Sequence, residues 1–302
     1  MTILTKRFQN AKGAISYLES LAYGTNDTIV FRGHEKESYR LNNTWQRHRS
    51  TPHESWSPDI DKTFTAYRVG LEKLGIKSFD NHNRFEAMEH ARHNGVPTPC
   101  LDFSYSPYVA LFFAFNGIRV SYSSNSYSVI YALNINRLAI ARAKELQGLQ
   151  FDNDLFYKIF HDFQWPKKEF FDNRFIADTL QFIPFPGSHN KRMQRQLGCL
   201  LYDTIHYKSR GLVDLDDYLA KIVEPLDGVT NKPSEPILTR VLINHKVVGD
   251  VLARLELINV TGGNLYNSAE GVVLDIKNSY NYNPKFSYLR DVNLPISDDT
   301  KM

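Results

Sequence analysis

A helical pattern opens the most informative stretch of the chain. Phe85, Met88 and Ala91 recur at helical spacing, and Gly95 stands where helices commonly end in a left-handed residue. The pattern therefore predicts a helix over residues 84–94.

A short extended segment and a second helix come next. Pro97 and Pro99 disfavour helix in the residues that precede them, and residues 100–103 alternate like a strand. Ser-Pro at 106 and 107 is typical of a helix start, and the residues up to 115 are almost all apolar. Because this helix lacks a polar face and is too short to cross a bilayer, we expect it to be buried in the core.

Polar side chains cluster between these two helices. They are His93, Asp102, Ser104, Tyr105 and Ser106. The first amides of a helix have no partners within the helix, and they favour negative charge. The cluster therefore predicts a site for an anion or a phosphate.

Elsewhere, helical patterns alternate with short β-branched or apolar runs. Strands are predicted at 28–31, 128–133, 198–202 and 237–243, and an amphipathic helix at 10–22. This alternation predicts an α+β fold, a mixed sheet with surrounding helices and the buried apolar helix. The expected parts are an N-terminal helix packed on the core (1–24), one main domain (25–277) and a C-terminal tail (278–302).

Composition adds few constraints. The 302 residues carry 36 Lys and Arg against 33 Asp and Glu, a net charge of +3, which permits contact with nucleic acid without arguing for it. The only cysteines, Cys100 and Cys199, are too few for a disulfide scaffold and favour a reducing compartment. No secretory or membrane-spanning run is visible, so we expect a cytoplasmic protein with no membrane partner.

Arg32 is the most informative residue before the central stretch. It comes at the end of the predicted strand, directly after residues 28–31, and is followed by Gly33, so a ligand could approach it closely. Its planar guanidinium suits a phosphate or a carboxylate, but a structural ion pair with Asp102 or another acid is an equal alternative. The polar segment 40–57, with Arg47 among its basic and aromatic residues, could grip a pyrophosphate or be a solvated loop.

Two further chemistries are compatible with residues of this stretch. Glu86, His90 and His93 lie at i, i+4 and i+7 on one side of the helix, a set that zinc or iron could use, but such spacing often arises by chance. We therefore expect no metal. Cys100 could be a nucleophile, although a packed thiol is the simpler interpretation.

Four blocks of residues resemble the FRG domain family, which is named after a Phe/Tyr-Arg-Gly motif. The blocks are Phe31-Arg32-Gly33, then Ala91-Arg92-His93-Asn94-Gly95-Val96-Pro97-Thr98 with Leu101-Asp102-Phe103-Ser104-Tyr105-Ser106-Pro107, then Arg192, Gln196 and Gly198, and finally Leu265-Tyr266 with Gly271. Their order matches that of the family, so residues 25–277 are interpreted as an FRG-like domain.

The chain departs from the family pattern at four positions. Arg92 replaces the usual Gln, Pro99 an Arg, Cys100 a Leu and Phe103 a Trp. If the family's Gln and Arg contact a ligand, those contacts differ in this protein.

A basic segment carries the third block. Lys191, Arg192 and Arg195 bring positive charge, and residues 198–202 are predicted as a strand. If the family motifs converge, Gln196 enters that strand and points at the same cleft as Arg32 and His93.

The order of these motifs is also similar, more distantly, to that of the ADP-ribosyltransferase superfamily. There an Arg or His on the first core strand holds NAD, a Ser-x-Ser or Tyr element follows on a second strand, and a glutamate stands on a later one. The resemblance implies that NAD is the substrate, that Arg32 binds its pyrophosphate or nicotinamide ribose, and that Ser104 and Ser106 contact the nicotinamide end. Gln196 stands where the glutamate would be, so Asp102 or Glu86 would have to supply its charge.

The implied site residues form two groups. The catalytic group is Arg32, His93, Asp102 and Gln196, and the group that binds NAD is Arg32, Gly33, Ser104, Tyr105, Ser106 and Arg192.

The resemblance implies a bacterial toxin or anti-phage effector that modifies nucleic acid, either RNA or DNA, or protein. Such a toxin needs restraint in its host, so a neutralising antitoxin or chaperone is an expected partner. The alternative is an FRG module that binds a nucleotide or RNA without catalysis. A nuclease is a third and less favoured interpretation, because no acidic metal cluster of the usual kind is evident.

Overall fold

A computed structural model describes ten segments of the chain. They are residues 3–48, 56–76, 84–119, 125–147, 152–165, 179–184, 190–204, 214–221, 236–285 and 289. Among these residues, no helix combines the length and the apolar character that a bilayer crossing requires.

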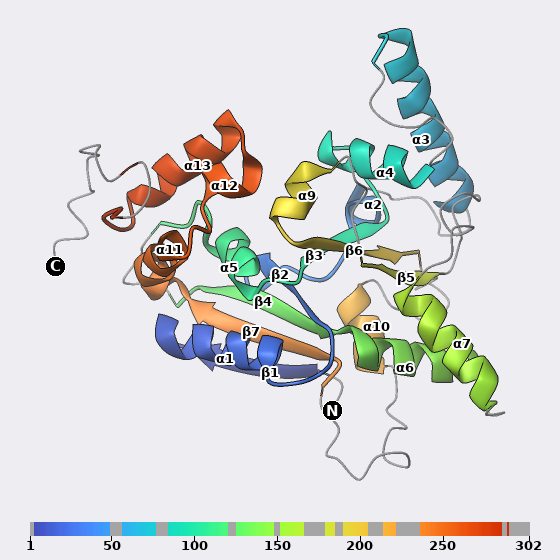
Figure 1. The fold of residues 1–302 in the computed structure, drawn as a ribbon, viewed down its shortest axis with the longest axis horizontal. Coiled ribbons are helices and arrows are strands. Elements are labelled where there is room, and N and C mark those ends of the chain that lie inside the picture. Colours follow the sequence, from blue (N-terminus) through green and yellow to red (C-terminus); the bar gives the residue numbers. More distant parts are fainter. Residues whose placement is uncertain are drawn as a thin grey trace.

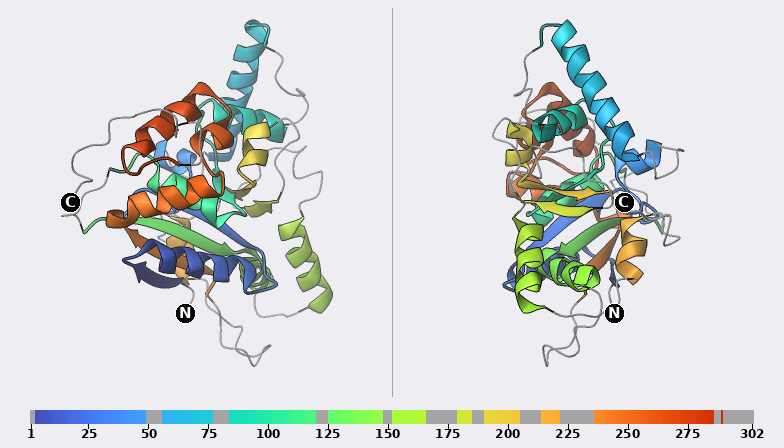
Figure 2. Two further views of the ribbon diagram at one scale, coloured as in Figure 1. Left: turned by 60° about the vertical axis from the view of Figure 1, so that its left-hand side comes forward. Right: turned by 90° about the vertical axis from the view of Figure 1, so that its right-hand side faces the viewer.

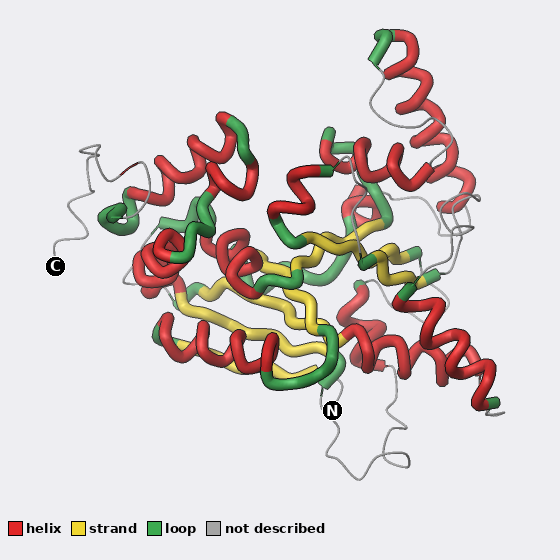
Figure 3. The backbone as a smooth tube through the Cα atoms, viewed as in Figure 1, coloured by secondary structure: helices red, strands yellow, loops and turns green. Residues whose placement is uncertain are grey.

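A seven-stranded sheet forms the centre of the molecule, with helices around it (Figures 1 and 3). Its strands, in spatial order, are β1 (Ile3–Phe8), β7 (Leu238–Asn244), β4 (Tyr127–Asn134), β2 (Ile29–His34), β3 (Cys100–Ser104), β6 (Gly198–Asp203) and β5 (Leu180–Ile183). Strand β1 pairs with β7 in parallel, and every other neighbouring pair is antiparallel. The predicted α+β fold with a mixed sheet is therefore confirmed.

The helices agree with most of the predicted periodicity. They are α1 (Ala11–Tyr23), α2 (Thr44–His48), α3 (Trp56–Lys73), α4 (Arg84–His93), α5 (Pro107–Phe115), α6 (Ile135–Gln147), α7 (Asn153–Gln164), α9 (Lys191–Arg195), α10 (Leu215–Lys221), the 3₁₀ turn η3 (His245–Val247), α11 (Val248–Leu257), α12 (Gly262–Tyr266) and α13 (Ala269–Ser279). Helix α3 projects away from the sheet, as both views in Figure 2 show.

The chain termini contribute more to the fold than the sequence indicated. Residues Ile3–Phe8 form β1, an edge strand that was not predicted, before α1 packs on the core. At the other end, Asn278 and Ser279 are buried within α13, and the side chain of Asn281 donates to the backbone oxygen of Ile118 at 2.8 Å. The described start of the predicted tail is thus docked on the core.

Alternate residues of the central strands face different hydrophobic clusters, as strand geometry requires. On one face, helices α6, α7 and α10 complete a single cluster. On the other face, α1, α5 and α11 cover the half of the sheet that contains β7, β4 and β2, and α2, α3, α4 and α9 cover the half that contains β3, β6 and β5. Two separate clusters therefore meet along the boundary between β2 and β3.

That boundary is weakly paired. Phe31 opposite Ser104 is the one register pair between β2 and β3, whereas β2 and β4 share six pairs and β3 and β6 share five. Beyond this point no register pair joins the two strands, so the sheet opens there.

Helix α5 lies against the opening and is buried, as predicted. Ser106 caps it by accepting from the amide of Val109 at 3.4 Å, and Pro107 occupies the first turn. A Cβ atom on Gly33 would lie 1.9 Å from the carbonyl oxygen of Ala110 in α5. Glycine is therefore required for β2 and α5 to approach this closely.

Candidate functional site

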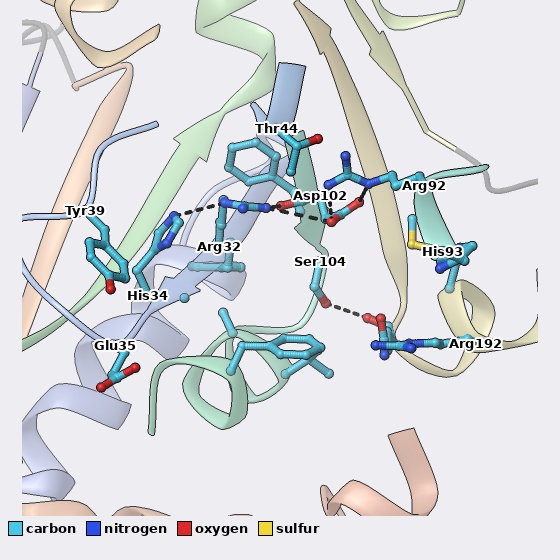
Figure 4. A pocket seen from close by; sticks show the side chains of 18 of the residues that line it. Arg32, His34, Glu35, Tyr39, Thr44, Arg92, His93, Asp102, Ser104 and Arg192 are labelled. Carbon is cyan, nitrogen blue, oxygen red and sulfur yellow. Dashed lines mark hydrogen bonds and ion pairs between the residues drawn. The ribbon is translucent and has the colours of Figure 1, made fainter. Parts of the chain in front are cut away.

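A pocket of about 480 Å³ opens where β2 and β3 separate. Elements β2, α4, β3, α5 and α9 contribute its walls (Figure 4). The residues of the predicted site that line it are Arg32, Gly33, His93, Asp102, Ser104, Arg192 and Gln196. Segments far apart in the sequence thus meet in one cavity, whereas Tyr105 and Ser106 do not line it.

Arg32 crosses the opening from β2 to β3. Its Nη1 donates to the backbone oxygen of Asp102 at 2.7 Å, and its Nε donates to Nε2 of His34 at 3.0 Å. Strand β2 continues to His34. Arg32 therefore lies within the strand, whereas the sequence had suggested that it lies at the end of the strand. Burial lowers the pKa of Arg32 to about 10, which still leaves the guanidinium charged at neutral pH.

Asp102 is neutralised chiefly by Arg92. Arg92 donates from Nε to one carboxylate oxygen at 2.6 Å and from Nη2 to the other, while Nη1 of Arg32 lies 4.0 Å from the carboxylate. Burial alone would raise the pKa of Asp102, but the attraction of Arg92 and its hydrogen bonds lower it. The predicted ion pair at Asp102 is therefore present, with Arg92 as its main partner.

His93 links α4 to α9. Its Nε2 is hydrogen-bonded to the side chain of Asn190, which also donates to Oε1 of Glu89 at 2.6 Å and caps α9 through the amide of Met193. Burial lowers the pKa of His93. The imidazole is therefore neutral at physiological pH.

Ser104 ends β3 and contacts the segment that precedes β6. Its hydroxyl donates to the backbone oxygen of Gln196 at 2.7 Å and accepts from the amide of Ser106 at 2.9 Å. Gln196 is the residue that follows α9, and Leu197 after it adopts a left-handed φ of 46°. Gln196 thus lies in the turn before β6 and not in the strand.

The hydroxyl groups of Tyr105 and Ser106 are engaged in local structure. Tyr105 donates to the backbone oxygen of Pro184 at 3.1 Å, and Ser106 caps α5. Ser104 is therefore the one member of the predicted Ser-Tyr-Ser turn whose side chain reaches the pocket.

Arg192 connects the pocket to the last described helices. Its guanidinium lies 3.9 Å from the ring centre of Tyr266, and its Nη1 lies 3.7 Å from a carboxylate oxygen of Glu270. The third and fourth motif blocks thus meet at the side of the pocket that α9 and α12 form.

Four residues of the pocket were not predicted from the sequence. His34, Glu35 and Tyr39 line it, and so does Thr44 of α2. The available signal for His34 was its position two residues beyond Arg32, which places both side chains on the same face of a strand.

Positive charge dominates the pocket lining. The lining contains four arginines, including Arg47 of α2, and two carboxylates, those of Glu35 and Asp102. Burial and the neighbouring arginines hold the pKa of His34 at about 2, so that this residue adds no charge. This excess of positive charge favours an anion as the ligand of the pocket.

The alternative chemistries gain little from the structure. Within the described segments, no group of three or more His, Cys, Asp or Glu side chains lies together in a way that could hold a metal ion. His90 is hydrogen-bonded to the hydroxyl of Tyr67 at 2.7 Å, and the side chain of Glu86 lies outside the described residues. Burial raises the pKa of Cys100 to about 12, as expected for a packed thiol.

Comparison with known proteins identifies one family. No curated protein and no solved structure matches the chain significantly. The family model of the FRG domain matches residues 27–122, a range that includes the Phe31-Arg32-Gly33 tripeptide, α4, β3 and α5. The first two blocks of the predicted resemblance lie inside this match, and Arg192 and Gln196, which lie outside it, complete the same pocket. The chain therefore carries an FRG domain over residues 27–122.

Proposed function

We propose that the pocket binds NAD through its pyrophosphate and that the protein is an NAD-dependent ADP-ribosyltransferase. The observation that carries the proposal is the placement of Arg32 and Ser104 on the two strands that splay apart, with the turn at Gln196 hydrogen-bonded to Ser104. This is the order in which the superfamily resemblance requires an arginine, a serine and a later polar residue to meet.

Charge and size support a dinucleotide. The excess of arginines over carboxylates in the lining suits the two negative charges of a pyrophosphate, and guanidinium groups match its oxygens in geometry. A volume of about 480 Å³ falls within the roughly 300–1,000 Å³ of pockets that bind small molecules.

The reaction needs positioning more than strong acid–base chemistry. The bond between C1′ of the ribose and the nicotinamide nitrogen breaks, and its electron pair leaves with nicotinamide. The acceptor then forms a new bond to C1′ and releases a proton. An oxocarbenium-like state of this kind is stabilised by a pocket that orients the ribose and excludes water.

In this proposal, two carboxylates that line the pocket assist the developing cation. Asp102 lies in the pocket wall, although Arg92 balances its charge. Glu35 also lines the pocket, and no ion pair engages its carboxylate within the described part of the chain. Gln196 cannot carry this charge, so Glu35 is the better base for the proton that the acceptor releases.

The acceptor approaches a basic rim. Helix α9 exposes Lys191 and Arg195 beside Arg192, which lines the pocket. This charge favours nucleic acid over protein as the acceptor. On the family resemblance we assign the protein to toxins or anti-phage effectors, for which a neutralising partner in the host is expected.

Labelled NAD tests the proposal. Purified protein is incubated with NAD that carries the label in its adenylate half, in a bacterial lysate, and label is followed into RNA, DNA and protein. We expect the wild type to incorporate label. Arg32→Lys should lose incorporation, because it keeps the positive charge but lacks the planar guanidinium group. Arg254→Ala, which changes an exposed arginine on α11, should incorporate label as the wild type does. Wild-type protein that binds NAD but neither consumes nor transfers it would refute catalysis.

A second function has its own observation in support. Gln196 stands where the superfamily resemblance implies a glutamate, and Arg92 neutralises the carboxylate of Asp102. These features fit a module that binds a nucleotide or RNA through the same arginines without catalysis. Such a module would show an affinity that depends on salt and would leave NAD intact.

A further inference from the structure

The guanidinium of Arg32 is held on two edges by uncharged acceptors. Nε donates to the imidazole of His34 at 3.0 Å, and Nη1 donates to the backbone oxygen of Asp102 at 2.7 Å. Figure 4 shows both contacts, with the guanidinium fixed between the two strands. Among the described residues, no hydrogen bond to protein engages Nη2.

The imidazole of His34 is itself fixed in place. It packs edge-on against Tyr131, with ring centres 5.8 Å apart, and against Tyr39 at 6.1 Å. Because Nε2 accepts from Arg32, the ring proton resides on Nδ1, which defines a single neutral tautomer.

The neutral state of His34 is secure. Burial, together with the charges of Arg32 and Arg47, lowers its pKa to about 2. A protonated imidazole could not accept from Arg32, so the observed contact depends on this neutrality.

Asp102, the carboxylate that acts on Arg32, is engaged chiefly by Arg92. The carboxylate of Asp102 takes two hydrogen bonds from Arg92, and Arg32 approaches it only to 4.0 Å. Arg92 is also fixed by the hydroxyl of Thr98 and the backbone oxygen of Cys100. Arg32 therefore retains its positive charge toward the pocket.

We propose that His34 is a positioning residue which holds the Nε edge of Arg32 through an uncharged acceptor, so that its Nη2 edge and its full charge face a bound phosphate. An acidic residue at position 34 would orient Arg32 equally well but would cancel the charge. A residue without an acceptor would preserve the charge but release the side chain. The inference rests on the proposed function in one respect, that the ligand of this pocket is a pyrophosphate.

Three substitutions at one position separate orientation from charge. Titration calorimetry with NAD, and in parallel with inorganic pyrophosphate, is performed on His34→Gln, His34→Ala and His34→Asp. The side-chain oxygen of Gln can take the place of Nε2, so we expect affinity within about threefold of wild type. Loss of the acceptor in His34→Ala, or cancellation of the charge in His34→Asp, is expected to weaken binding about tenfold or more.

A control keeps folding apart from binding. His161→Ala changes an exposed histidine on α7, away from the pocket, and should bind as wild type. Thermal unfolding is recorded for each variant, and rescue by Gln shows that the fold tolerates substitution at this position.

The outcomes distinguish the two proposals. Wild-type protein that binds neither NAD nor pyrophosphate overturns the proposed function and this inference with it. Wild-type binding together with undiminished binding by His34→Ala and His34→Asp overturns the role of His34 alone. Equal weakening in His34→Gln and His34→Ala also overturns it, because the acceptor would then not be the property that matters.

Discussion

The contact between Gly33 and α5 leads to a sharp prediction for stability. A Cβ atom at position 33 would lie 1.9 Å from the carbonyl oxygen of Ala110 and 2.9 Å from the amide nitrogen of Ala114. Both are backbone atoms of a buried helix, so no side chain can rotate away. To restore even a 3.0 Å contact, β2 and α5 must separate by about 1.1 Å.

The cost of Gly33→Ala should be at the upper end of that for overpacking a core, about 3 kcal/mol. At about 2–4 °C per kcal/mol for a domain of moderate size, the melting temperature should fall by roughly 6–12 °C. Because Arg32 is the adjacent residue, the same displacement should weaken the proposed binding of NAD.

Thermal and urea unfolding followed by circular dichroism measure the effect. Gly70→Ala is the matched control, since Gly70 lies in α3 and an added Cβ would meet nothing within 4 Å. That substitution should be neutral or stabilising by about 0.5–1 kcal/mol. If Gly33→Ala unfolds at the temperature of the wild type, the close packing of β2 on α5 is not as described.

Three further predictions concern charge and burial. The lowered pKa of Asp102 means that its stabilisation is present above the unfolded pKa and is lost as pH falls through the folded one. Wild-type protein should therefore lose more stability than Asp102→Asn between pH 6 and pH 3 in urea titrations, and equal losses would contradict the ion pair. Cys100 and Cys199 are buried with raised pKa values, so iodoacetamide at pH 8 should label them only after denaturation, as mass spectrometry can show. Arg192→Ala should cost about 0.5–2 kcal/mol through the lost contact with Tyr266, whereas Arg192→Lys should retain part of it.

Local chemistry explains why the central stretch was predictable. A serine cap, a proline in the first turn and a left-handed glycine act over a few residues, and each of them stands where the sequence places it. The alternation of apolar residues likewise predicted β3, and the Ser-Pro start with the continuous apolar run after it predicted the buried α5.

Edge and turn elements were harder to predict. Strand β1 is half polar because it lies at the edge of the sheet, so its sequence lacks the apolar run of β4. Leu197 takes a left-handed backbone that leucine rarely adopts, which separates Gln196 from the strand that follows.

The contacts within the pocket could not be read from the sequence. Which side chains meet across β2 and β3 depends on how the strands splay, and no local pattern encodes that angle. The sequence therefore suggested Asp102 as a partner of Arg32, whereas Arg92, one of the departures from the family pattern, occupies its carboxylate.

The weak pairing of β2 and β3 has a mechanical consequence. On the face that carries α5, each half of the sheet has its own hydrophobic cluster, and a single register pair joins β2 to β3. On the opposite face one cluster spans both halves. A pyrophosphate bound by both Arg32 of β2 and Arg192 of α9 would connect the two halves across this boundary. Ligand at one hundred times its dissociation constant adds about 2.7 kcal/mol to stability. In this fold much of that gain should appear as slower amide hydrogen exchange in β2 and β3. The bound ligand would then contribute directly to the stability of the sheet.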